Sequence, residues 1–315
     1  MTVSIKVYTE DDRFEWNNFV SSSRNGHFMF DRSYMEYHSD RFSDFSLMAY
    51  DQKNKLIAVL PANISGKTIY SHQGLSFGGL VISNKVGAEQ VIEIFEALTK
   101  YLRVKSDVNS LVYKRIPDFY CSYPSQEDLY SLFLLGANLI RRDVSVAVDL
   151  ENPLPIKEMR RRKIKKAIKH EITVNEDEEF SEFWGILAEV LEYKHGATPV
   201  HTVDEIMMLK SRFPENIRCF TARLSGKVLA GTVVFETDTV AHAQYLASNH
   251  TGRELGALDL VIAHLKDIVY SGKRYFDFGI STENDGRYLN KGLISQKEGF
   301  GARAFVHDFY EIDVK

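Results

Sequence analysis

The chain has few of the features that mark specialised protein classes. Its 315 residues include only two cysteines, Cys121 and Cys219, too few for a disulfide framework or a four-thiolate zinc site. No apolar run approaches the roughly 18 residues of a membrane-spanning helix. Residues 1–8 alternate polar and apolar side chains and lack the apolar centre of a signal peptide. These absences predict a cytoplasmic protein without a transmembrane segment.

The chain also lacks a strong charge of either sign. Its 39 basic and 43 acidic residues give a net charge of -4, which argues against a generic nucleic-acid coat, so we expect no DNA partner. There is no P-loop, no dinucleotide fingerprint and no Gly-x-Ser-x-Gly motif. No spacing of histidines and carboxylates gives a convincing metal site, so we expect no metal.

The composition is that of a globular protein, and the length is that of two domains. A hydrophobic fraction of 44% and a charged fraction of 26% are ordinary, and 315 residues suit two average domains. Residues 143–150 alternate like a strand, and Pro153 and Pro155 then interrupt regular structure. We therefore predict domains at 1–151 and 152–315. Each half has helices, a strand meander, a strand, a helix and a strand, which predicts tandem α+β domains with mixed central sheets flanked by helices.

The first candidate site follows the strand predicted over 241–247. A loop over 248–257 leads into an amphipathic helix over 255–270, and such a junction presents backbone N–H groups to phosphate oxygens. Arg253 adds a positive charge there. The predicted donor-binding residues are Asn249, Gly252, Arg253, Gly256 and Ala257. An ordinary helix N-cap loop is the alternative interpretation.

Two further segments carry acid, base or cationic groups. Glu283 and Asp285 follow the strand over 274–278, where a polar loop could accept a proton or bind an amine or hydroxyl. Lys291 and Lys297 flank the apolar pair Leu293–Ile294 and could bring an ammonium group to a developing oxyanion. The alternatives are a solvated loop and a short helix with solvated lysines.

The remaining candidates are basic and aromatic residues of the second half. Residues 157–169 form a predicted helix with eight lysines and arginines, so Arg160 and Lys163 are candidates for binding an anion. A solvated helix face and amphipathic membrane attachment are the alternatives, although the apolar stripe lacks Trp and Phe. His242 is either a base or a satisfied core histidine. The substrate-binding candidates beyond the basic helix are His195, His201 and Tyr245, together with Lys291.

Four segments together resemble a known family. They are residues 160–169, the loop His195-Gly-Ala-Thr-Pro-Val-His201, Tyr275-Phe-Asp-Phe-Gly-Ile-Ser281 and Gln296-Lys-Glu-Gly-Phe-Gly301. In this order they resemble the Fem-type peptidyltransferase family, and within it an acetyltransferase-like bacterial branch. The resemblance covers most of the chain and implies two tandem GNAT-like (acyl-CoA N-acyltransferase-like) domains. It places the acyl-CoA pyrophosphate on residues 249–257 and matches the family's C-terminal lysine to Lys297, with Lys291 as the second choice.

The resemblance implies transfer of an acyl or aminoacyl group to an amine or hydroxyl. The leading expectation is an acyltransferase that uses acetyl-CoA or another acyl-CoA, with Lys297, Glu283 and His242 as catalytic residues and a small-molecule or sugar-nucleotide acceptor. The second is an aminoacyl-tRNA-dependent ligase acting on a peptidoglycan precursor, the only interpretation that needs tRNA. The third is a non-catalytic protein that binds anionic ligands. The sequence leaves the acceptor, the acyl group and the oligomeric state open.

Overall fold

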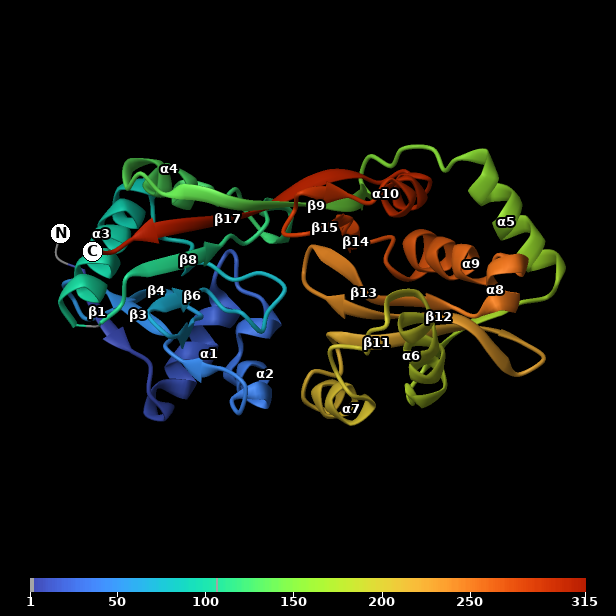
Figure 1. Ribbon diagram of the computed structural model, residues 1–315, viewed down its shortest axis with the longest axis horizontal. Coiled ribbons are helices and arrows are strands. Elements are labelled where there is room, and N and C mark those ends of the chain that lie inside the picture. Colours follow the sequence, from blue (N-terminus) through green and yellow to red (C-terminus); the bar gives the residue numbers. More distant parts are fainter. Residues whose placement is uncertain (1–2, 106) are drawn as a thin grey trace. The chain divides into compact units, whose positions relative to one another are not determined.

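The computed structural model describes residues 3–105 and 107–315 and divides them into two compact units (Figure 1). The first unit runs to Asp143 and also contains residues 284–287 and 306–315. The second contains residues 144–283 and 288–305. The division after Asp143 lies eight residues before the predicted boundary, and two later segments group with the first unit. No described helix is long and apolar enough to cross a membrane.

The first unit contains strands in two sheets. One sheet has the order β1 (Ser4–Val7), β3 (Leu47–Tyr50), β4 (Leu56–Leu60), β7 (Val81–Ile82). The other strands follow the order β17 (Arg303–Asp313), β8 (Ser110–Lys114), β6 (Thr68–Tyr70), β5 (Asn63–Ser65), β2 (Ser43–Asp44). The helices are α1 (Arg13–Ser22), α2 (Arg32–Met35), α3 (Ala88–Lys105) and α4 (Glu127–Leu134).

Helix α3 forms the centre of the first unit's core. The helical period predicts one apolar face, and none of its side chains is more than 2% exposed: Val91, Ile94, Phe95, Leu98 and Leu102. They pack with side chains of β3, β4 and β8. Burying such side chains contributes about 1.5–3 kcal/mol each, so this face holds the helix in place.

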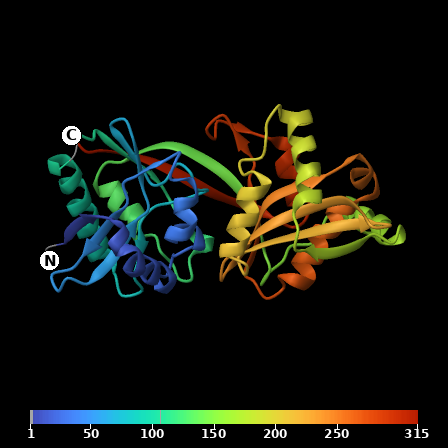
Figure 2. The ribbon, with the colours of Figure 1, turned by 90° about the horizontal axis from the view of Figure 1, so that it is seen from below.

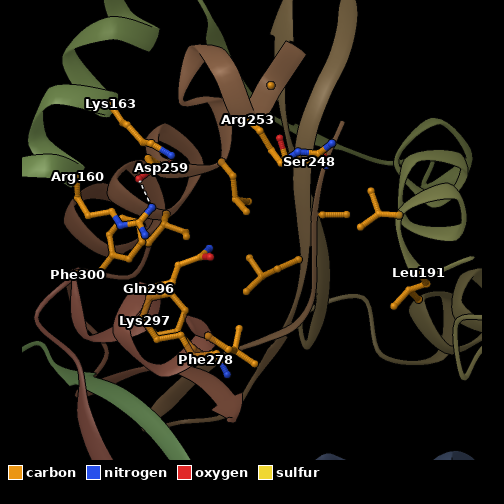
Figure 3. A pocket seen from close by; sticks show the side chains of 17 residues that line it. Arg160, Lys163, Leu191, Ser248, Arg253, Asp259, Phe278, Gln296, Lys297 and Phe300 are labelled. Carbon is orange, nitrogen blue, oxygen red and sulfur yellow. Dashed lines mark hydrogen bonds and ion pairs between the residues drawn. The ribbon is translucent and has the colours of Figure 1, made fainter. Parts of the chain in front are cut away.

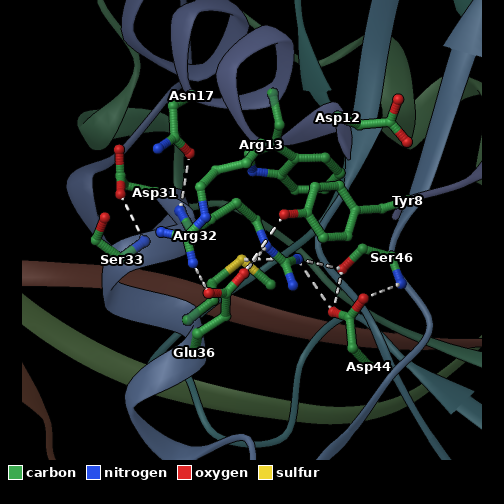
Figure 4. Close-up of polar contacts among 12 residues, drawn as sticks. Tyr8, Asp12, Arg13, Asn17, Asp31, Arg32, Ser33, Glu36, Asp44 and Ser46 are labelled. Atoms are coloured by element: carbon green, nitrogen blue, oxygen red, sulfur yellow. Dashed lines mark hydrogen bonds and ion pairs between the residues drawn. The ribbon is translucent and has the colours of Figure 1, made fainter. Parts of the chain in front are cut away.

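A buried arginine stabilises the other side of the first unit. The Arg32 side chain is 3% exposed and donates to Glu36 from Nε (3.2 Å) and to Asp44 from Nη1 (3.1 Å) (Figure 4). Its guanidinium carbon lies 3.8 Å from the centroid of the Tyr8 ring. The charge is therefore compensated on its polar side and covered by an aromatic face on the other, which makes this cluster structural.

The second unit is a mixed sheet covered by helices on both faces. Its strand order is β10 (Thr173–Asp177), β11 (Ile217–Leu224), β12 (Lys227–Glu236), β13 (Val240–Ser248), β14 (Tyr275–Ile280), β9 (Asn138–Asp149). Its helices are α5 (Glu158–Lys169), α6 (Ser181–His195), α7 (Val203–Arg212), α8 (His250–Leu255), α9 (Ala257–His264) and α10 (Lys291–Glu298), and a small hairpin joins β15 (Thr282–Glu283) to β16 (Tyr288–Leu289). Helix α9 lies on one face of β11–β13, and α6 and α7 lie on the other (Figures 1 and 2). Both sheets and helices are present, as the predicted α+β class requires.

The parallel pair β13–β14 is short. Its ladder joins Val240 to Tyr275, Ala241 to Phe276 and His242 to Asp277, and it ends there. Strand β13 continues to Ser248, and a bulge interrupts its pairing with β12 after Val233. A bulge increases the local twist of a strand, and beyond His242 and Asp277 the two strands part because they are no longer paired with each other.

Each unit receives a closing strand from a distant part of the chain. Residues 145–149 of β9 pair with β14 in the second unit, whereas residues 309–313 of β17 pair with β8 in the first. The predicted domains, 1–151 and 152–315, put the strand over 143–150 in the first half and the C-terminal residues in the second, whereas residues 144–149 belong to the second unit and residues 306–315 to the first. Hydrophobic alternation identifies both strands, but alternation does not specify the partner of a strand, so this exchange had no local signal.

Candidate active site

A cavity of about 340 Å³ opens in the second unit where β13 and β14 part (Figure 3). Both strand ends line it, through Leu246 and Ser248 of β13 and Phe278 of β14. Helices α5, α6, α8, α9 and α10 supply the other walls. Its apolar lining includes Val190, Leu191, Leu258, Ile262, Leu293 and Phe300. The volume, and a lining that combines this apolar surface with charged and polar side chains, are typical of a small-molecule site.

The predicted donor loop is a helical turn in the structure. Asn249 begins α8 because its Oδ1 accepts a hydrogen bond from the Gly252 N–H (2.8 Å). Gly256 ends α8 with φ +80°, and α9 starts at Ala257. The prediction of a loop was wrong because Asn249 is a good N-cap and a single glycine does not stop one helical turn. Gly252 and Arg253 line the cavity, whereas Asn249, Gly256 and Ala257 shape the junction behind it.

Two cations at this cavity have no acidic partner. The Arg253 Nη1 donates to the Ser248 carbonyl (2.7 Å), and Lys163 reaches the cavity from α5. Within the part of the chain that the structure describes, neither side chain has a carboxylate at ion-pair distance. An anionic group of a ligand would meet two uncompensated positive charges here.

Lys297 is buried at the opposite end of the cavity. It is 6% exposed, and its Nζ donates to the carbonyl oxygens of Gly279 (2.9 Å) and Ile280 (2.6 Å). Burial lowers the pKa of this lysine to about 8, and the Asp277 carboxylate partly opposes the shift. The alternative of a solvated Lys297 is therefore excluded. Lys291 is the exposed first residue of α10 and does not line the cavity.

A histidine and an aspartate meet where the parallel ladder ends. The His242 Nδ1 lies 2.7 Å from the Asp277 Oδ2, and Asp277 is fully buried. The other oxygen of Asp277 accepts from the Ser145 hydroxyl and from the Gly279 N–H, both at 2.9 Å. A carboxylate at Nδ1 favours the tautomer whose lone pair is on Nε2, which is the arrangement of a general base.

Comparison with known proteins identifies this region. Residues 157–288 match the family model of the acetyltransferase (GNAT) domain, and this segment contains His242, Asp277, Arg253 and the parted strands. The match covers 132 of the 315 residues, so it shows that the second unit is similar to a GNAT domain. No curated protein matches the chain.

Solved structures extend the likeness in fold to the whole chain. FemX is 11% identical with a TM-score of 0.68, covering 98% of this chain and 97% of its own. L-PGS from Bacillus licheniformis is 11% identical with a TM-score of 0.62 (96% and 92%). A tandem GNAT protein from the clavulanic acid biosynthesis pathway is 10% identical with a TM-score of 0.51 (99% and 99%). Such low identities establish the fold alone, and the predicted tandem GNAT fold is confirmed.

Within the GNAT domain, Arg160 has a role that the sequence analysis did not assign. Its Nη1 binds the Asp259 Oδ1 at 2.8 Å, with the two side chains 7% and 8% exposed (Figure 3). Its guanidinium carbon lies 5.2 Å from the centroid of the Phe300 ring. Arg160 lines the cavity but already has a counterion, so it joins α5 to α9.

The other predicted site residues of the GNAT domain lie away from the cavity lining. The His201 Nδ1 and the Tyr245 hydroxyl are 2.5 Å apart in a buried pair, and Trp184 packs on Tyr245. Glu283 is exposed on the β15–β16 hairpin and accepts from Asn290 (2.8 Å). His195 is the last residue of α6, and its side chain lies outside the part of the chain that the structure describes. Their assigned roles stay predictions.

Asp277 and Asp259 were not among the site residues predicted from the sequence. Asp277 interrupts the apolar strand Tyr275-Phe-Asp-Phe278, and a carboxylate among aromatic residues of a buried strand signals a specific partner. Asp259 stands in the apolar run Ala257-Leu-Asp-Leu-Val-Ile262 and gives the same signal. Neither position reveals which cation or histidine it meets.

Proposed function

We propose that the second unit transfers an acyl group, acetyl in the simplest case, from an acyl-CoA to an amine or hydroxyl acceptor. The observation that carries the proposal is the cavity at the parting of β13 and β14, which combines an apolar wall from α6, α9 and α10 with two cations that have no acidic partner, Arg253 and Lys163. An acyl-pantetheine arm suits the apolar lining, and its phosphate groups suit the cations. Acetyl-CoA is accordingly the first donor to test.

The residues at the ladder's end supply the chemistry that acyl transfer requires. The acceptor loses a proton as it attacks the acyl carbonyl, and His242, oriented by Asp277, takes that proton and returns it to the leaving thiolate. The carbonyl oxygen gains negative charge, which the Lys297 ammonium stabilises with the proton left over from its two carbonyl hydrogen bonds. The Gly279 N–H donates to Asp277 and the Gly279 carbonyl oxygen accepts from Lys297, so one strand end holds the partner of the base and the cation. Lys297 lines the cavity, whereas His242 and Asp277 lie outside its lining.

Charge reversal of Arg253 tests the donor site. We expect Arg253→Glu to weaken acetyl-CoA binding by about 1–3 kcal/mol, because a charge-assisted hydrogen bond becomes a repulsion. The measurement is isothermal titration calorimetry. Arg161→Glu is the matched control, because Arg161 lies on α5, is 57% exposed and does not line the cavity. Equal losses in the two variants would place the donor elsewhere.

Removal of the Lys297 ammonium tests the catalytic assignment. With an amine acceptor found by screening, we expect Lys297→Ala to lower kcat by roughly 10²-fold or more with the circular dichroism spectrum retained. If Lys297 only binds a phosphate, KM rises and kcat is nearly kept. Lys291→Ala, an exposed lysine of the same helix, serves as the control. Unchanged kinetics in both variants would remove Lys297 from the mechanism.

A specific observation favours a second candidate, the aminoacyl-tRNA-dependent ligase. Helix α5 exposes a row of basic side chains: Arg161, Arg162, Lys165, Lys166 and Lys169. Such a surface could follow a phosphate backbone, with an affinity that falls steeply with salt. Binding of charged tRNA that Arg162→Glu weakens, together with no binding of acetyl-CoA, would favour the ligase over the acyl-CoA enzyme.

A further inference from the structure

The first unit contains a cavity of its own, of about 480 Å³. Tyr70 of β6 and Val112 and Lys114 of β8 line it. Alternate residues of the same strands, Ile69 and Leu111, lie in the core beneath α3. The cavity is therefore on the face of these strands that points away from that core. The segment after β6 lines it with Ser71, His72 and Gln73, and β9 lines it with Ile140 and Arg141. Asp285 of the loop at 284–287 and Phe309 of β17 complete the lining.

Lys114 brings an uncompensated positive charge to this cavity. Its Nζ donates to the carbonyl oxygens of His72 (3.1 Å) and Leu75, and lies 5.7 Å from the centroid of the Phe309 ring. Among the described residues, no carboxylate lies within ion-pair distance of it. Burial, together with the charge of Arg141, lowers the pKa of Lys114 to about 8, although Asp143 opposes the shift.

The other charged and titratable groups beside Lys114 do not supply the missing counterion. Arg141 holds Asp143 through Nε (2.8 Å) and Asp285 through Nη1 (2.7 Å), so these two carboxylates already have a cation. Burial lowers the pKa of His72 to about 3, so this ring is neutral at physiological pH. Lys114 is thus the group at the cavity whose charge a ligand can compensate.

We propose that this cavity binds a small organic anion, a carboxylate or phosphate ester with an apolar body. Its anionic group meets the Lys114 ammonium, whose third proton is not used by the two carbonyl hydrogen bonds. Its body lies against Val112, Ile140 and Phe309, which form the apolar wall. The volume is that of a small-molecule site. This second site lies wholly in the first unit and does not depend on acyl transfer in the second.

Anion binding at Lys114 is coupled to proton uptake. Near pH 8 about half of the Lys114 side chains are neutral, and a bound anion favours the ammonium form. Binding therefore takes up as much as about half a proton per ligand at this pH. The uptake falls toward zero at pH 6, where Lys114 is already charged.

The experiment is calorimetric titration at pH 8 with phenyl phosphate and benzoate, in two buffers of different ionisation enthalpy. We expect the wild type to bind with proton uptake, and Lys114→Met to bind at least tenfold more weakly with no uptake. Lys67→Met is the matched control, because Lys67 is 58% exposed and paired with Asp107. It should bind as the wild type does. Which of the two probes binds more tightly distinguishes a phosphate ester from a carboxylate as the source of the anion.

A second variant keeps the test decisive if Lys114→Met does not fold. Ile140 lines the cavity and is 39% exposed, so Ile140→Glu adds a negative charge without opening the core. We expect it to abolish binding of both probes. Lys297→Ala should bind them normally, which separates this site from the proposed acyl transfer. No binding by the wild type at about 10 mM, equal binding of inorganic phosphate, or affinity unchanged in both cavity variants overturns the proposal.

Discussion

We predict that the buried ion pair between Arg160 and Asp259 makes a large contribution to the unfolding free energy of the second unit. Both side chains are less than a tenth exposed, and the contact is 2.8 Å. Replacing Arg160 by methionine leaves the Asp259 carboxylate buried without a counterion, a loss that typically costs 3–5 kcal/mol. The Arg160 Nε is itself buried without a hydrogen-bond partner among the described residues. Removing that unsatisfied donor returns about 1 kcal/mol or more.

We therefore expect Arg160→Met to lower the unfolding free energy of the second unit by about 2–4 kcal/mol. Asp259→Leu leaves the Arg160 guanidinium buried without a counterion, and we expect it to lower the unfolding free energy by a similar amount. The double variant should be close to wild type, because two apolar side chains replace two charges and no charge is left unpaired. The difference between the double variant and the sum of the singles is then a coupling energy of several kcal/mol.

The assay follows urea unfolding by tryptophan fluorescence. The chain has two tryptophans, Trp16 in the first unit and Trp184 in the second, so a Trp16→Phe background reports the second unit alone. Arg161→Met, on the same helix but 57% exposed, is the control and should cost little. Additive single losses, or single losses below about 1 kcal/mol, would refute the claim that this pair is a coupled buried unit.

Two other predictions concern the junction of α8 with α9 and the buried lysine. In Gly256→Ala the new Cβ would lie 2.5 Å from the Lys163 carbonyl oxygen, at a φ of +80°. We expect the unfolding free energy, measured in urea, to fall by about 2 kcal/mol or more. We also expect weaker acetyl-CoA binding, measured by calorimetry. Gly272→Ala, which meets open space, is the control, and equal stability of the two variants would contradict the prediction. The pKa of Lys297 is about 8 in the folded protein and 10.5 without perturbation, so between these pH values the folded state binds fewer protons and its stability rises with pH. The rise is on the order of 3 kcal/mol, and Lys297→Met should lack it, because methionine does not titrate. The measurement is the gap in unfolding free energy between wild type and variant at pH 7 and pH 10, and a constant gap counts against the assignment.

The elements that the sequence specifies locally could be predicted. Helix α3 buries one face, which leaves a helical period in the sequence, and β12 is a largely apolar run that is buried along nearly its whole length. Strand β10, with the sequence Thr-Val-Asn-Glu-Asp, shows no such alternation, and its pairing with β11 defines it. An edge strand held by backbone pairing leaves little trace in the side chains.

The candidate site depends on contacts that no local pattern encodes. His242 and Asp277 are 35 positions apart and meet only because of the register of the parallel pair. Lys297 was a candidate from its segment, but its burial depends on two carbonyl groups that β14 brings to it. Glu283 has the right chemistry, yet the β15–β16 hairpin turns it to the surface. Residue type suggests chemistry, whereas tertiary pairing decides which residues meet.

The first unit can complete its sheet only after the ribosome has synthesised β17, because β17 pairs with β8. Lys114 of β8 pairs with Phe309 of β17, so at 5–20 residues per second the edge of β8 stays open for on the order of 10–40 s after it is translated. An open strand edge is a template for another chain, and crowded nascent chains could capture one another's β17. A gene cut once near residue 143 would encode a fragment with this edge permanently bare. Both units therefore have to be encoded by one gene and synthesised as one chain, although each has its own core.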